Sequence, residues 1–274
     1  MTRYRVNCEA YRVRFCVGSD CSDLLELALL EAPFGCMIQN EDVPTAPEYF
    51  LQRKQGSAFC RLLLEGESIT EWLDADRVLA HLRGELMVYV ANLAPDFVFL
   101  HAGVVGWHGS AFVLPGTSFA GKSTLVGALV RAGATYYSDE YAVVDDAGRI
   151  HPYARDLQMR QIGGLDQHAV SVAELGGQSG TDPLRLGSVV FCQYARNAVW
   201  SPKPVSPGMA VLEMLTHAIP VQRTPGRVMS VLAKMMTGAT SMRTERGEAA
   251  DAARRILGLC DPTDCGPGTG KSPQ

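Results

Sequence analysis

Several features of other protein classes are missing from this 274-residue chain. It has no basic excess, because 25 Lys and Arg against 29 Asp and Glu leave a net charge of −4, whereas nucleic-acid-binding proteins need cations to neutralise phosphates. It also has no apolar run long enough to span a bilayer, and the start, Met1-Thr-Arg-Tyr-Arg-Val6, does not resemble a signal peptide. We therefore expect a cytoplasmic protein that binds neither nucleic acid nor membrane.

Cysteine is present, but not in the spacing of a metal site or of a disulfide framework. The eight cysteines never form C-x-x-C, and no histidine precedes His81, so zinc is not expected. A chain of this length without a secretion signal does not need disulfides to stabilise its core. We expect reduced, mostly buried thiols.

The composition, 47% hydrophobic and 20% charged, is that of a globular chain with one or two domains. Alternating runs predict strands at 4–7, 11–17 and 59–64. A short helix is expected over 20–30, capped by Ser22 or Asp23, and helical spacing predicts a second helix from Asp74 to about Leu93. We predict a small β-rich domain with this bridging helix over 1–96, a core over 97–260 and a tail over 261–274.

Within the core, two apolar runs flank Trp107-His-Gly-Ser110, which predicts a hairpin. Further strands are expected at 134–137, 141–144 and 188–192, and residues 163–183 are expected to form a loop. The C-terminal part is expected to be helical at 208–219, 228–236 and 247–259, with its methionines packed in the core.

The most informative segment fits the phosphate-binding pattern G-x-x-x-x-G-K-[ST], with an apolar run before it and a helical stretch after it. Its residues are Gly116, Thr117, Ser118, Phe119, Ala120, Gly121, Lys122, Ser123 and Thr124. In such a loop the backbone N–H groups surround phosphate oxygens at a helix N-terminus. Lys122 would reach the β- and γ-phosphates, and the Ser123 hydroxyl would bind Mg²⁺. The segment predicts binding of a nucleoside triphosphate.

An acidic pair follows the next predicted strand. A right-handed crossover would place that strand beside the one before the phosphate loop, so Asp139 would lie near the γ-phosphate. There it could accept the proton of an attacking hydroxyl, and Glu140 could hold Mg²⁺. The alternative is a solvated turn. In the hairpin, His101 should pair back against Pro115 and Gly116, where it either contacts phosphate or is structural.

His101, the phosphate loop fifteen residues later and the acidic pair resemble the catalytic core of the HPr serine kinase/phosphorylase family. The run is also similar to the shorter kinases related to that family, including those that tailor lasso peptides. The resemblance implies an α/β P-loop core that uses ATP and Mg²⁺, with Asp139 as general base, Ser123 and Glu140 on the metal, and His101 on the γ-phosphate. Thr124 stands where the family has Glu, so we do not take phosphorolysis or a second metal ligand as implied by the resemblance.

The expected reaction is phosphoryl transfer from ATP to a hydroxyl, foremost a serine of a peptide or protein. Two alternatives remain open: a small-molecule kinase on the same core, and a nucleotide-dependent binding or switch protein with slow hydrolysis. Arg155 and Arg160 are candidates for a phosphate or an anionic acceptor, or simply surface residues. A basic strand bearing Arg12 and Arg14 could pair with an acceptor peptide at a sheet edge, or serve packing in a homo-oligomer.

Overall fold

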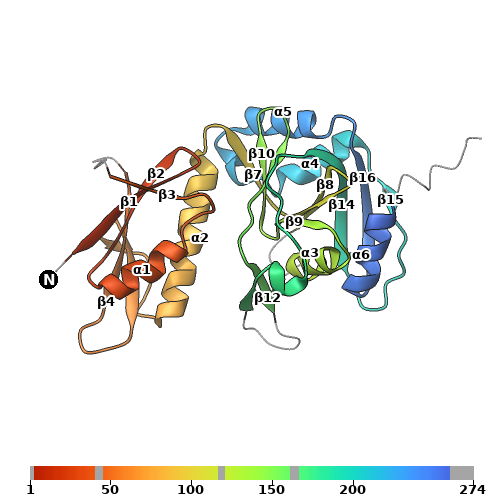
Figure 1. Ribbon diagram of the computed structural model, residues 1–274. Coiled ribbons are helices and arrows are strands. Elements are labelled where there is room, and N and C mark those ends of the chain that lie inside the picture. The colour runs from red at the N-terminus through yellow and green to blue at the C-terminus, as the bar shows by residue number, and fades with distance from the viewer. Residues whose placement is uncertain (1–2, 41–45, 117–120, 161–166, 260–274) are drawn as a thin grey trace, which may run out of the picture. The chain divides into compact units, whose positions relative to one another are not determined.

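The computed structural model describes residues 3–40, 46–116, 121–160 and 167–259 (Figure 1). The chain forms two compact units of mixed α/β structure. The N-terminal unit comprises residues up to Phe99 together with Gln222–Thr224, and the C-terminal unit comprises Leu100–Val221 and the residues from Pro225 onward. The division follows Phe99, slightly beyond the residue 96 expected from the sequence.

The N-terminal unit contains a six-stranded sheet in the order β3-β1-β2-β4-β5-β6. Its strands are β1 (Tyr4–Ala10), β2 (Val13–Ser19), β3 (Met37–Gln39), β4 (Glu48–Arg53), β5 (Cys60–Leu64) and β6 (Glu67–Ser68). Two helices, α1 (Ser22–Leu30) and α2 (Ala75–Leu93), complete it. The expected strands and helices of this region are thus confirmed.

The two helices begin differently. The Asp74 side chain accepts a hydrogen bond from the Arg77 N–H at 2.9 Å, which is a regular N-terminal cap for α2. Helix α1, by contrast, is preceded by Cys21 and has no side-chain cap. The predicted caps Ser22 and Asp23 are therefore wrong, because both residues already belong to the first turn of α1.

The basic strand is not at a sheet edge, so the expected pairing with an acceptor peptide there is wrong. β2 lies between β1 and β4, and its backbone groups are used by both neighbours. Carboxylates also neutralise its arginines: Arg12 contacts Asp96 and Arg14 contacts Glu9, each at 2.8 Å. Arg12 precedes the strand in a turn with φ 63°.

The C-terminal unit contains an eight-stranded sheet in the order β11-β10-β7-β8-β14-β16-β15, with β9 also paired to β7. Its strands are β7 (Phe97–Trp107), β8 (Ser110–Pro115), β9 (Thr135–Ser138), β10 (Tyr141–Asp145), β11 (Ile150–His151), β14 (Arg185–Tyr194), β15 (Lys203–Pro204) and β16 (Thr240–Arg246). β7 and β8 form the predicted hairpin, whose two-residue turn places His108 and Gly109 at positive φ.

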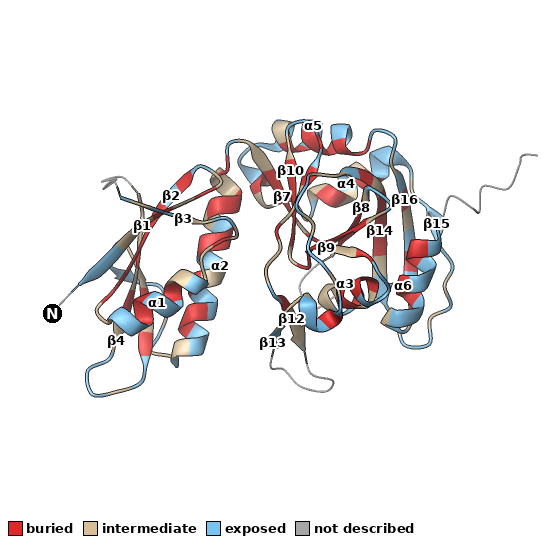
Figure 2. Ribbon diagram, in the orientation of Figure 1, coloured by how far each residue is buried: buried red, intermediate tan, exposed pale blue. Residues whose placement is uncertain are grey.

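Helices cover the faces of this sheet. They are α3 (Lys122–Arg131), α4 (Pro207–Leu215), α5 (Pro225–Met235) and α6 (Ala249–Gly258), with 3₁₀ turns at Ala173–Leu175 and Ile219–Gln222. Phe112 and Leu114 of β8 share a core with α3 and α6, while the intervening Val113 is equally buried. Figure 2 shows the buried sides of α3 and α6 directed at the strands. α4 and α5 pack on the sheet elsewhere, against β16 and β10.

The sequence analysis did not predict β3, β4, β6, β11, β12 (Leu157–Arg160) or β15, and it missed two further strands. β13 (Gln167–Val170) pairs with β12 inside the expected loop. β16 lies between the helices predicted at 228–236 and 247–259, where no strand was expected, and it pairs in parallel with β14. Its buried side chains are polar, Ser241, Thr244 and Arg246, so the apolar alternation that indicates a strand is absent.

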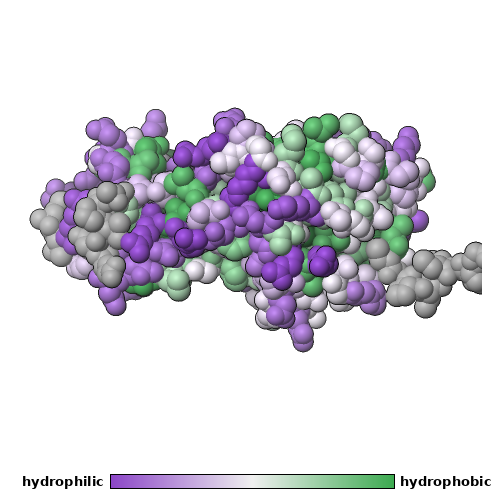
Figure 3. Space-filling view, turned by 90° about the horizontal axis from the view of Figure 1, so that it is seen from above, coloured by the Kyte–Doolittle hydropathy of each residue, from purple (hydrophilic) through white to green (hydrophobic). Residues whose placement is uncertain are grey.

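The helical methionines also divide differently from the expectation of core packing. Met214, Met235 and Met236 are buried, whereas Met209 of α4 and Met229 of α5 are about half exposed. Figure 3, which looks down on this side of the unit, shows hydrophobic surface among polar residues there. The expected core packing is thus confirmed for the three buried methionines and is wrong for Met209 and Met229.

Candidate functional site

The glycine-rich segment Gly116–Thr124 joins a buried strand to a helix. β8 ends at Pro115 and α3 begins at Lys122. Gly121 adopts φ 76° before the first helical residue, a left-handed conformation that favours glycine. The Lys122 ammonium donates to the Gly116 carbonyl at 2.9 Å, so the side chain is directed back toward the end of β8. The predicted phosphate-loop residues Thr117, Ser118, Phe119 and Ala120 lie outside the described residues.

The N-terminal half of β7 connects this segment to the acidic pair. Ala102 pairs with Pro115 on one side, and its N–H donates to the Glu140 carbonyl at 3.1 Å on the other. β9 therefore lies across β7 from β8, not beside β8 as the crossover argument predicted. Both strands run antiparallel to β7 and hence in the same direction, so Asp139 and Glu140 still reach the sheet edge at which Gly116 lies.

Asp139 is buried, with 7% of its surface exposed, and held by two donors. The Tyr136 hydroxyl lies 3.0 Å from its Oδ1, and the Gln158 N–H donates to its Oδ2 at 3.2 Å. Burial raises the pKa of Tyr136, helped by the Asp139 charge, so the tyrosine remains a neutral donor. These contacts fix the direction of the carboxylate, which is not the behaviour of a solvated turn.

Arg155 and Arg160 are the two arginines predicted to contact a phosphate or an acceptor. The Arg155 carbonyl lies 2.8 Å from the Tyr136 hydroxyl, so its backbone belongs to the same hydrogen-bonded group as Asp139. The Arg155 side chain is partly buried. The Arg160 side chain lies outside the described residues, although its backbone forms the end of β12.

Burial is the main influence on the charged groups at this edge. Burial lowers the pKa of Lys122 to about 8, against the opposing effect of Asp139 and Glu140. Burial also lowers the pKa of His101 to about 4, and the nearby Lys122 and His217 lower it further. His101 is therefore neutral at pH 7 and can donate or accept a hydrogen bond, but it is not a cation.

His101 occupies the position that the hairpin predicted. Its carbonyl accepts from the Gly116 N–H at 3.3 Å, and its own N–H donates to the His217 carbonyl at 2.8 Å. His217, just beyond α4, was not identified from the sequence, and neither was Tyr136. Both look like ordinary core or helix-end residues in the sequence. The fold brings His217 to His101, and it turns the Tyr136 hydroxyl toward Asp139, three residues later in the chain.

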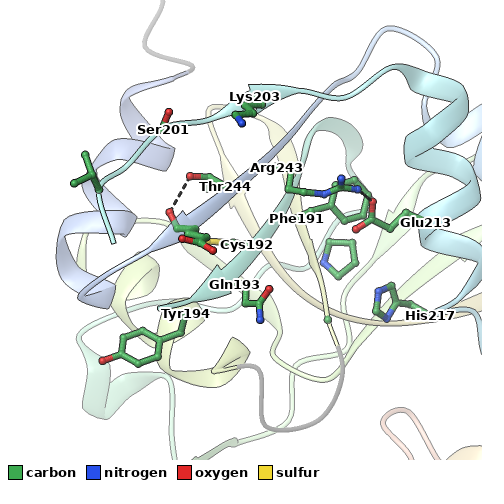
Figure 4. Close-up of a pocket in the computed structure, with 14 residues that line it drawn as sticks. Phe191, Cys192, Gln193, Tyr194, Ser201, Lys203, Glu213, His217, Arg243 and Thr244 are labelled. Atoms are coloured by element: carbon green, nitrogen blue, oxygen red, sulfur yellow. Dashed lines mark hydrogen bonds and ion pairs between the residues drawn. The ribbon is translucent and has the colours of Figure 1, made fainter. Parts of the chain in front are cut away.

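A pocket of about 940 Å³ adjoins Gly116 at the carboxyl ends of β8, β14 and β16. Figure 4 shows its mixed lining: the Arg243 guanidinium lies beside Phe191 and meets the carboxylate of Glu213, with His217 below them and Lys203 opposite. Ligands of parallel-strand α/β sheets bind at this end of the strands. The pocket was not predicted from the sequence.

The side chains here suit Mg²⁺ in the way nucleotide-dependent enzymes hold it, through one or two protein oxygens together with phosphate oxygens and water. Glu140 and Ser123 are partly buried and could supply those oxygens. Among the described residues, no cluster of three or more His, Cys, Asp or Glu forms a metal site made of protein ligands alone. Any Mg²⁺ at this site would therefore share its ligands with a bound phosphate.

No family model matches this chain, and no curated protein matches it. None of the helices in the described part of the chain is long and apolar enough to cross a membrane. Its function is therefore argued from the site itself.

Proposed function

We propose that this chain is an ATP-dependent kinase that transfers the γ-phosphate to a hydroxyl group, with the HPr-kinase-like P-loop core that the sequence resemblance implies. The observation that carries the proposal is the meeting of Lys122 and the acidic pair at one sheet edge, from two separate strand ends. Lys122 lies at the N-terminus of α3, where phosphate is favoured by the free N–H groups and the helix dipole.

In the proposed reaction the acceptor oxygen forms a bond to the γ-phosphorus while the bond to the leaving oxygen of ADP breaks. The acceptor proton passes to the Asp139 carboxylate, and ADP leaves with the electron pair. Tyr136 and the Gln158 N–H hold Asp139 in one orientation for that transfer. Lys122 offsets the charge that builds up on the phosphate oxygens, and Mg²⁺ supplies further charge neutralisation when bound.

His101 and Ser123 complete the proposed site. A neutral His101 beside Lys122 would donate a hydrogen bond to a phosphate oxygen without adding charge. Ser123, the second residue of α3, would place its hydroxyl on the metal. The acceptor is a serine of a peptide or protein in the first instance, or a small-molecule hydroxyl, and the pocket beside Gly116 has the volume and mixed lining for either acceptor or nucleoside.

Two variants test the proposal. Lys122→Ala should abolish MgATP binding, because the phosphates lose their main side-chain cation, whereas Asp139→Asn should retain MgATP affinity and lose phosphoryl transfer. Binding is measured by calorimetry. Transfer is measured by mass spectrometry of a cell extract incubated with protein and ATP, searching for a phosphorylated species that is absent with Asp139→Asn. Lys234→Ala, on α5, where the side chain donates to the Asp146 carbonyl, is the matched control.

Unchanged ATP binding in Lys122→Ala would refute the nucleotide site. ATP consumption by the purified protein alone, with no acceptor, would instead indicate a slow hydrolase of the binding or switch type.

A further inference from the structure

Arg246, the last residue of β16, is a buried cation directed at the start of α3. Only 4% of its surface is exposed. One guanidinium nitrogen, Nη2, donates to the Gly121 carbonyl at 3.0 Å, and the other, Nη1, donates to the Gly247 carbonyl at the same distance. Strand β16 thus brings a positive charge to the residue that precedes Lys122.

Among the described residues no carboxylate forms an ion pair with this charge, and Glu248 favours it only through a weaker electrostatic effect than the opposing effect of burial. None of the ion pairs between them includes Arg246, and its buried Nε has no hydrogen-bond partner. The face of Tyr194, its neighbour across the sheet, lies 5.3 Å from the guanidinium carbon and offsets only part of the cost. Burial of a cation that is only partly compensated is unfavourable, so we expect a further counter-charge for Arg246 in the working protein.

The approach of Arg246 also depends on glycine at position 121. A Cβ on Gly121 would lie 2.7 Å from the Arg246 Nη2, so the guanidinium would have to leave its present position. Gly121 therefore meets two requirements, the left-handed backbone before α3 and room for the guanidinium.

We propose that Arg246 is the second fixed cation of a polyphosphate site at the N-terminus of α3, and that the phosphates of a bound nucleotide are its counter-charge. The inference rests on the proposed function and extends it: Lys122 and Arg246 approach the same helix end, one from the helix and one from β16. The ligand class is a nucleoside di- or triphosphate, recognised through its phosphate oxygens.

The competing explanation is a structural clamp, in which Arg246 only ties β16 to the backbone at Gly121 and Gly247. The two explanations predict different effects of Arg246 on the affinity for pyrophosphate. A clamp contributes to stability and leaves the affinity of the folded protein for pyrophosphate unchanged, whereas a phosphate-site cation contributes to that affinity directly.

The test is calorimetric titration of the full chain with pyrophosphate and with ADP, both with Mg²⁺. Arg246→Met removes the charge and keeps an apolar stem in the core. Arg246→Lys keeps the charge but loses the paired donors of the guanidinium. Arg254→Gln, whose side chain is exposed on α6, is the control. We expect Arg246→Met to weaken both ligands by about tenfold or more, Arg246→Lys by a few-fold, and Arg254→Gln by less than about twofold.

Equal affinity of wild type and Arg246→Met for both ligands would overturn the inference while leaving the proposed function standing. Weaker pyrophosphate binding with unchanged ADP binding would assign the site to free phosphate and overturn its nucleotide part. If Arg246→Met does not fold, the affinity of Arg246→Lys for the two ligands is the test. Wild-type affinity in Arg246→Lys would then overturn the inference. A wild-type chain that binds neither ligand would overturn both proposals.

Discussion

At the scale of single residues, the site depends on how Asp139 is held. Its carboxylate receives hydrogen bonds from the Tyr136 hydroxyl, on β9, and from the Gln158 N–H, on β12. Tyr136 is fully buried, and its hydroxyl also lies within 2.8 Å of the Arg155 carbonyl. The tyrosine is a positioning residue that acts on the proposed reaction through Asp139.

Tyr136→Phe removes that hydroxyl and little else. We expect kcat to fall several-fold, up to about tenfold, with KM for ATP nearly unchanged, because Asp139 loses orientation while the phosphate contacts remain. The free energy of unfolding should fall by about 1 kcal/mol. Steady-state kinetics and urea denaturation measure the two effects.

Tyr137→Phe is the matched control for this prediction. Tyr137 is the next residue on β9, and its hydroxyl donates to the Asp182 carbonyl, away from Asp139. It should lose a similar amount of stability and keep its kcat. A fall in kcat of the same size in both variants would mean that Tyr136 acts through stability alone.

At the scale of elements, the position of α3 against the sheet depends on a glycine in β7. A Cβ on Gly103 would lie 2.6 Å from the Cγ2 of Val126, which is fully buried on α3. This close approach lets the helix lie low over the hairpin strands. It thereby sets the height of Lys122 above the sheet edge.

Gly103→Ala should therefore destabilise the protein by about 1–3 kcal/mol, because the stiff, β-branched Val126 cannot move away without shifting α3. Val126→Ala alone also destabilises by leaving a cavity. The double variant should be more stable than the sum of the two single losses predicts, since the second change makes room for the first. Urea denaturation of all three variants measures this coupling.

Gly84→Ala in α2 serves as the control. A Cβ there meets no atom within 4 Å, and glycine in an exposed helix interior costs up to about 1 kcal/mol relative to alanine. The control should therefore gain stability. Additive losses in the Gly103 and Val126 pair would mean that the close contact does not restrain α3.

At the scale of the whole molecule, the proposed site lies entirely within the C-terminal unit. Lys122, Asp139, His101 and Arg246 all belong to it, whereas Arg12 and Arg14 of the N-terminal unit are paired with carboxylates of their own unit. Ligand binding should thus stabilise the C-terminal unit more than the N-terminal unit.

We expect MgATP to slow amide hydrogen exchange in α3, β8 and β9, and to leave β1, β2 and β4 unchanged. The reason is that a ligand suppresses local opening only where its contacts are lost on opening. Exchange measured by mass spectrometry with and without MgATP tests this. Equal protection in both sheets would contradict a site confined to the C-terminal unit.

Local patterns in the sequence were sufficient for much of this architecture. The apolar runs around Trp107–Ser110 predicted the hairpin, and Asp74 marked the start of α2, because turns and caps depend on neighbouring residues. The strand–glycine–helix arrangement around Lys122 was likewise visible from the spacing of its residues.

Tertiary structure alone decided the rest, because it depends on which distant segments meet. β16 is buried through Ser241, Thr244 and Arg246, and no polar residue signals burial in a sequence. Sheet order, which short-range patterns do not encode, puts β9 across β7 and β2 in the interior of its sheet. The Gln158 N–H that holds Asp139 likewise comes from a segment 19 residues away. The sequence thus determined the local chemistry at Lys122 and Asp139, and the fold determined which other side chains surround them.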